Sequence, residues 1–85
     1  MKIYAYKRTN KDINQTKYFT DLNNAIEYAI QDVTGFYSIY HPEINLKYSS
    51  FLSHEETGII TLLFNKENEK SPYICTDIRQ YETVD

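Results

Sequence analysis

The stretch TDLNNAIEYAIQDVTG, residues 20–35, decides the fold. Its apolar side chains recur at intervals of three and four residues, which places them along one face of an α-helix. This stripe consists of Leu22, Ala25, Ile26, Ala29, Ile30 and Val33. Thr20 or Asp21 can cap the first turn by accepting backbone N–H bonds, and Gly35 can supply a left-handed stop. We therefore predict one amphipathic helix between this cap and Gly35.

The segments on either side of the helix have strand character. Residues 2–8 alternate, with Ile3 and Ala5 on one side and the tyrosines on the other, which is typical of a half-buried strand. We expect a turn over 9–15 and a short strand over 16–19 before the helix. After the helix, the pattern predicts strands over 36–40, 44–52, 59–64 and 72–81, joined by the turns 41–43 and 53–58 and the loop 65–71.

These elements predict a single α+β domain over residues 1–85, in the order ββαββββ. One helix packs on a five- or six-stranded, mainly antiparallel sheet, and it can cover only one face of that sheet. With Ile60, Leu62 and Phe64 toward the helix, Ile59, Thr61 and Leu63 point outward. We expect Tyr4 and Tyr6 on the outward side too, with Tyr73 and Cys75 as neighbours. So apolar a face needs a cover, such as a second copy or a partner.

The composition limits the class of protein. The single cysteine, Cys75, cannot form an internal disulfide, which favours a reducing compartment. The first ten residues, MKIYAYKRTN, lack the apolar core of a signal peptide, and no apolar run reaches the ~20 residues of a membrane span. We expect a soluble cytoplasmic protein with no membrane partner.

The side chains that usually carry chemistry do not form a recognisable set. His54-Glu55-Glu56 lacks the second histidine of a zinc motif, and His41 stands alone before a proline. Cys75 lies in a strand pattern that indicates a small buried side chain rather than a nucleophile. Two glycines are too few for a phosphate-binding loop. We expect a non-enzyme with no cofactor and no metal.

Charge suggests two candidate contact surfaces. Residues 1–19 carry a formal charge of +4 and residues 20–85 carry −7. A line of carboxylates along an edge can occupy a cationic groove made for phosphates, although solubilising loops give the same pattern. The acidic candidates are Glu55, Glu56, Glu67, Glu69 and Asp77. The second surface joins Tyr4, Tyr6 and Arg8 with nearby lysines, where bases can stack on tyrosine and cations can hold phosphates.

Nine tyrosines in 85 residues favour contact with another molecule over chemistry on one. Ile, Lys, Asn, Tyr and Phe, which have A/T-rich codons, make up 37 residues and indicate an AT-rich gene, as in many phages. Our leading hypothesis is a small phage- or mobile-element-encoded inhibitor that blocks a host protein, for example a nucleic-acid-processing one, as anti-CRISPR proteins do. The alternatives are a nucleic-acid-binding module, which we favour less, and a structural homodimer that closes its open sheet faces.

Overall fold

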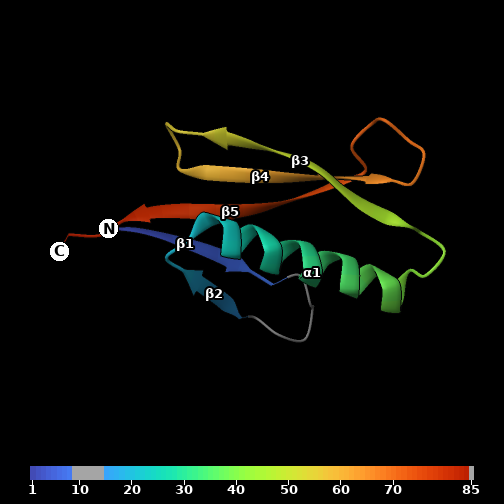
Figure 1. Cartoon of the computed structure of the whole chain (residues 1–85), viewed down its shortest axis with the longest axis horizontal. Coiled ribbons are helices and arrows are strands. Elements are labelled where there is room, and N and C mark those ends of the chain that lie inside the picture. The colour runs from blue at the N-terminus through green and yellow to red at the C-terminus, as the bar shows by residue number, and fades with distance from the viewer. Residues whose placement is uncertain (9–14, 85) are drawn as a thin grey trace.

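The computed structural model describes residues 1–8 and 15–84. One helix packs on one face of a five-stranded antiparallel sheet, whose strand order is β2-β1-β5-β4-β3 (Figure 1). The elements are β1 (Lys2–Lys7), β2 (Thr16–Phe19), α1 (Leu22–Tyr40), β3 (Leu46–His54), β4 (Ile59–Lys66) and β5 (Ile74–Glu82). The α+β class and the antiparallel sheet are therefore confirmed. Of the turn expected over 9–15, residues 9–14 lie outside the described part of the chain.

The helix begins as predicted but ends one and a half turns later. The Asp21 carboxylate caps it by accepting a hydrogen bond from the backbone N–H of Asn23 at 2.9 Å. The prediction of a strand over 36–40 is wrong, because α1 continues through Gly35 to Tyr40. Phe36 and Tyr40, one turn apart, pack their rings with centroids 4.7 Å apart, which supports the extra turns. Pro42 has no N–H and disfavours helical backbone in the residue before it, so the helix ends here.

Gly35 is a helix-interior residue and not a stop, which leads to a testable prediction. A Cβ added there meets nothing within 4 Å. Replacing Gly35 by alanine removes backbone freedom from the unfolded chain, and we expect it to raise the free energy of unfolding by about 0.5–1 kcal/mol. Urea unfolding followed by circular dichroism measures this change. A loss of stability would show that this turn of α1 is not regular helix.

The core lies between α1 and the sheet. From β4 it takes Ile60, Leu62 and Phe64, so the prediction that these three face the helix is confirmed. Ala25 and Ala29 are fully buried, and their small side chains let the helix lie close to the strands. The remaining core residues are Tyr4, Tyr6, Val33, Leu46 and Ile78.

The expectation that Tyr4 and Tyr6 point outward is wrong, and so is the expectation that Cys75 is buried. Tyr4 and Tyr6 point toward the helix and are buried, because Tyr6 pairs with Ile78, which in turn pairs with the core residue Ile60. The phenol of Tyr6 can be buried since it donates a hydrogen bond to the Asp32 carboxylate on α1 at 2.8 Å. Cys75 is exposed rather than buried, as it lies on the uncovered face opposite Leu63.

Two further features of the sheet matter below. The β3–β4 pairing shifts register between Tyr48 and Ser50, which marks a β-bulge in the edge strand. The chain ends meet at one end of the sheet, where the backbone N–H of Thr83 donates to the carbonyl of Met1 at 2.8 Å (Figure 1). Within the described ranges, no helix is both long and apolar enough to cross a membrane.

Candidate interaction surface

Among the described elements, none covers the face of the sheet turned away from α1 (Figure 1). Cross-strand partners point to the same side of a sheet, so the register fixes which residues share this face. One row crosses the sheet from Tyr18 through Ala5, Arg79 and Ile59 to His54. We call this surface the open face, and its other members are Ile3, Lys7, Lys47, Leu52, Thr61, Leu63, Cys75, Asp77 and Tyr81.

Large apolar side chains stand exposed on the open face. Tyr18 is 67% exposed, Leu52 51% and Tyr81 49%. Ile59 and Leu63, between them on β4, are half-buried although no helix covers them. Tyrosine with aliphatic neighbours is the composition of a protein contact surface rather than of a solvated sheet face.

The charges of the open face differ from those of the whole molecule. The chain carries a net charge of −3. Of the ten acidic residues in the described part of the chain, only Asp77 lies on this face, and its carboxylate accepts a hydrogen bond from the Thr61 hydroxyl at 2.9 Å. Three cations share the face, Lys7, Lys47 and Arg79. The open face is therefore positive on an acidic protein, and it suits a partner that presents carboxylates around an apolar centre.

The acidic residues singled out from the sequence are not brought together. Glu55 and Glu56 lie in the β3–β4 turn, at one end of β4, and Glu67 and Glu69 lie in the β4–β5 loop, at the other end. Asp77 sits on β5 between those two ends. The Glu67 carboxylate accepts a hydrogen bond from the Asn45 side chain, so it also has a structural role. These carboxylates belong to separate parts of the surface.

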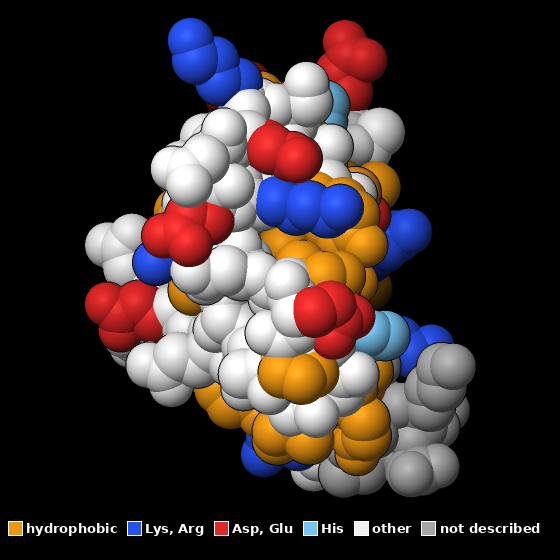
Figure 2. Space-filling model, turned by 90° about the vertical axis from the view of Figure 1, so that its right-hand side faces the viewer, with side chains coloured by type: hydrophobic (Ala, Val, Ile, Leu, Met, Phe, Trp, Pro, Cys, Tyr) orange, Lys and Arg blue, Asp and Glu red, His pale blue; other side chains and the backbone are white. Residues whose placement is uncertain are grey.

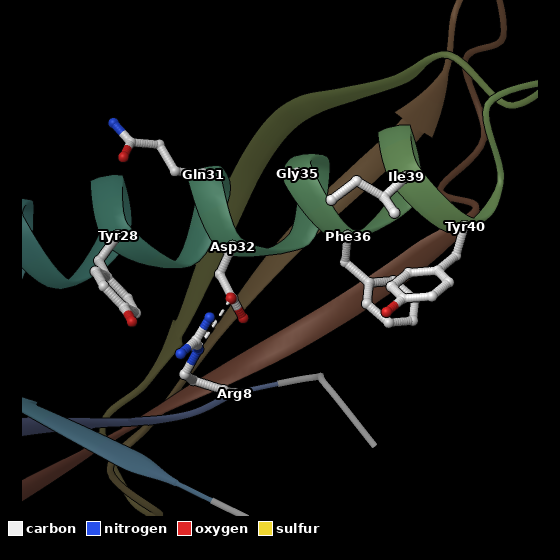
Figure 3. Close-up of a pocket in the computed structure, with 8 residues that line it drawn as sticks. All are labelled: Arg8, Tyr28, Gln31, Asp32, Gly35, Phe36, Ile39 and Tyr40. Carbon is white, nitrogen blue, oxygen red and sulfur yellow. Dashed lines mark hydrogen bonds and ion pairs between the residues drawn. The ribbon is translucent and has the colours of Figure 1, made fainter. Parts of the chain in front are cut away.

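Arg8 takes part in an ion pair and not in a basic strand face. Its Nε donates to the Asp32 carboxylate at 3.2 Å, and Asp32 also accepts the hydrogen bond from Tyr6 (Figure 3). This pair forms one side of an open groove of about 380 Å³ beneath the second half of α1. Tyr28, Phe36 and Tyr40 project from the helix into the same groove, as Figure 3 shows.

A second apolar area adjoins this groove, at the end of the molecule where α1 ends, and shares Ile39 and Tyr40 with it. Figure 2 looks onto this end and shows hydrophobic side chains gathered there, with charged side chains on and around them. Its exposed members are Ile39, Tyr40 and Tyr73, and the Lys66 ammonium lies 4.4 Å from the centre of the Tyr73 ring. We call this area the end patch. It gives a matched comparison for the open face, because it also exposes tyrosine but belongs to another element.

No arrangement for metal binding is present among residues 1–8 and 15–84, where no three His, Cys, Asp or Glu side chains are grouped closely enough. Comparison with protein families, curated proteins and solved structures gave no match. The choice of a candidate surface therefore rests on the composition, exposure and charge of the surfaces described above. Within the described part of the chain the open face is the best candidate, because it joins exposed tyrosines and aliphatic side chains from five strands with a charge opposite in sign to that of the protein.

The prediction that Ile59, Thr61, Leu63 and Cys75 lie on the outward side of the sheet is confirmed. Tyr18 was not assigned to this side, although it pairs with Ala5 and so points away from the helix. Tyr81, Arg79 and Leu52 were not considered. A signal for Tyr81 and Arg79 exists in the sequence, since both alternate with Ile78 and Gln80 along the last strand, but it requires knowing that Ile78 faces the helix.

Proposed function

We propose that the protein is a small, non-enzymatic binding protein that acts in the cytoplasm by occupying, and thereby blocking, a surface of another protein. The observation that carries this proposal is the open face, with Tyr18, Leu52 and Tyr81 each about half exposed or more on a side of the sheet that no described element covers. Interfaces draw their affinity from a few aromatic and arginine side chains near their centre. Tyr18, Tyr81 and Arg79 are side chains of this kind.

The chemistry of the open face favours a protein over a nucleic acid. Leu52, Ile59 and Leu63 offer aliphatic surface, which packs against apolar protein side chains but gives no platform for stacked bases. Asp77 stands among the cations and would repel phosphates. A standard interface takes about 800 Å² from each partner, which is a modest part of the 6049 Å² surface of this chain.

The charge of the open face defines the partner further. Lys7, Lys47 and Arg79 favour a target surface with carboxylates around an apolar centre, and such complementarity raises the rate of encounter. The AT-rich codon composition favours a phage or mobile-element gene, so an inhibitor of a host defence protein is the version to test first. It would act stoichiometrically, by mass action, and would alter no bond in its target.

The test compares two double variants of the same kind. We expect Tyr18→Ala with Tyr81→Ala to weaken binding to a captured target about 100-fold or more, because two exposed aromatic anchors are lost. The matched control, Ile39→Ala with Tyr40→Ala, removes exposed apolar side chains from the end patch and should leave the affinity within about threefold. Calorimetric titration of the purified target gives both affinities, and titration of the activity of the target shows whether one equivalent blocks it.

Three results would count against the proposal. Equal binding by the open-face variant and the original protein would remove the open face from consideration. Loss of binding only in the end-patch variant would move the site to the end of α1. Retention of short single-stranded nucleic acid, lost with Tyr18→Ala and Tyr81→Ala and falling steeply with salt, would replace the protein target by a nucleic acid.

A further inference from the structure

The two edges of the sheet are unequal. The β2 edge is four residues long and carries Lys17. The β3 edge is nine residues long, and its segment Tyr48–His54, YSSFLSH, contains no Lys, Arg, Asp, Glu or Pro. Charges and prolines are what usually prevent an edge strand from pairing with another chain. Apart from its bulge, β3 lacks this protection, so it is open to an added strand.

Each face of this edge exposes one large apolar side chain. Phe51 pairs with the core residue Leu62, so it lies on the helix side of the sheet, yet it is 44% exposed because α1 does not cover the end of β3. Leu52, on the open face, is 51% exposed. An added strand would therefore gain backbone hydrogen bonds along the edge and apolar contacts on both sides of it.

We propose that the strand added at this edge is β3 of a second copy, in antiparallel pairing centred on Phe51, so that Ser50–His54 of each copy lies opposite Tyr48–Leu52 of the other. The two sheets would become one sheet of ten strands, with a two-fold axis that passes near Phe51. This symmetry places Phe51 beside its counterpart in the second copy, and Leu52 beside Ser50 of that copy. Pairing of this segment with itself brings no like charges together, because the segment contains no Lys, Arg, Asp or Glu.

The charged residues on either side of this segment also favour a second copy as the partner. Lys47 precedes it, and Glu55 and Glu56 follow it in the β3–β4 turn. Antiparallel self-pairing brings Lys47 of each copy next to the Glu55–Glu56 turn of the other, so opposite charges meet at both ends. The bulge between Tyr48 and Ser50 adds one residue between the two-fold axis and Lys47. Lys47 therefore faces the turn as a whole and not one fixed glutamate.

The arrangement has a geometric consequence that does not depend on the proposed function. A two-fold axis perpendicular to the sheet puts both copies of α1 on one side of the ten strands. Both open faces then form one continuous surface on the other side, with Leu52 of each copy near the middle. The end patches remain outside the contact, since α1 ends away from this part of β3 (Figure 1).

Sedimentation equilibrium over about 10 µM to 1 mM protein tests the proposal, since a short strand contact gives a weak dimer in this range. We expect a reversible dimer of twice the chain mass of 10.1 kDa. Phe51→Lys places two ammonium groups side by side at the axis and should raise the dimer dissociation constant more than tenfold. Tyr18→Ala with Tyr81→Ala is the control and should leave this constant within about twofold.

A charge exchange tests the pairing direction and does not depend on how well Phe51→Lys folds. Lys47→Glu alone, and Glu55→Lys with Glu56→Lys, should each raise the dissociation constant about fivefold or more, because like charges then face each other. The triple variant should return it to within about threefold of the original value. A monomer at 1 mM, a dimer that only the open-face control disrupts, or growth beyond the dimer would each overturn the proposal.

Discussion

Replacement of Tyr6 by alanine is expected to lower the free energy of unfolding by about 4 kcal/mol. Tyr6 is fully buried, and its ring meets the edge of Tyr28 with centroids 6.0 Å apart. The change leaves a cavity under α1 and removes the hydrogen bond to Asp32. Since a domain of this size has a total stability near ~5 kcal/mol, the variant should keep only about 1 kcal/mol, which leaves about 15% of the molecules unfolded at room temperature. Urea unfolding followed by circular dichroism is the measurement, as the chain has no tryptophan.

Two milder variants separate the contributions. Tyr6→Phe keeps the ring and deletes only the hydroxyl, so we expect a loss of about 1 kcal/mol. Tyr18→Ala, on the open face, should change the stability by no more than about 0.5 kcal/mol. If Tyr18→Ala proved as costly as Tyr6→Ala, the assignment of these tyrosines to opposite faces of the sheet would be refuted.

The second large effect is expected at Gly58, the last residue of the β3–β4 turn. Gly58 has φ of +69°, and a Cβ there would lie 2.9 Å from the backbone carbonyl oxygen of Gln80. The two residues are also held together by a hydrogen bond of 2.7 Å from the Gln80 N–H to the Gly58 carbonyl. Alanine must strain the backbone and push β5 away, so we expect Gly58→Ala to cost about 3 kcal/mol.

Asparagine at the same position distinguishes the two causes. It tolerates a left-handed backbone better than alanine but carries the same Cβ. If close approach to Gln80 dominates, Gly58→Asn should be as destabilising as Gly58→Ala in the same urea experiment. If asparagine is tolerated within about 0.5 kcal/mol, the explanation by contact is wrong and only the dihedral angle matters. Gly35→Ala, which should stabilise, shows that the loss is not a general effect of replacing glycine.

The sequence was sufficient for the class of fold and for the start of the helix, because local patterns decide both. The apolar residues from Leu22 to Val33 follow the 3.6-residue period of a helix and not the two-residue period of a strand. Asp21 caps this helix, as its carboxylate side chain suggests. The end of α1 was misplaced for a local reason too. The segment FYSIY, residues 36–40, is aromatic and rich in strand formers, and Gly35 before it resembles a stop. The contact between Phe36 and Tyr40 one turn apart outweighs that propensity.

The residues of the open face were less predictable, because the alternation in a strand shows two faces but not which one is covered. For residues 2–8 that choice depends on the pairing of Tyr6 with Ile78, and on a hydrogen bond to Asp32 that is 26 residues away in sequence. Tyrosine is well suited to either side, since its ring can be buried when its hydroxyl has a partner. The positions of Glu55 and Glu67 at opposite ends of β4 were predictable, as each follows from a turn next to a strand.

The hydrogen bonds that join Met1 to Thr83 have a practical consequence for the order of the chain. Since the two ends already touch, a short linker between them would close the backbone into a ring without bending the sheet. The ring could then be reopened in the β4–β5 loop, at residues 67–70, which lie exposed at the far end of β4. In such a circular permutant β5 becomes the first strand and leads directly into β1, its neighbour in the sheet. The same architecture would then form from a chain in which these two adjacent central strands are a local hairpin.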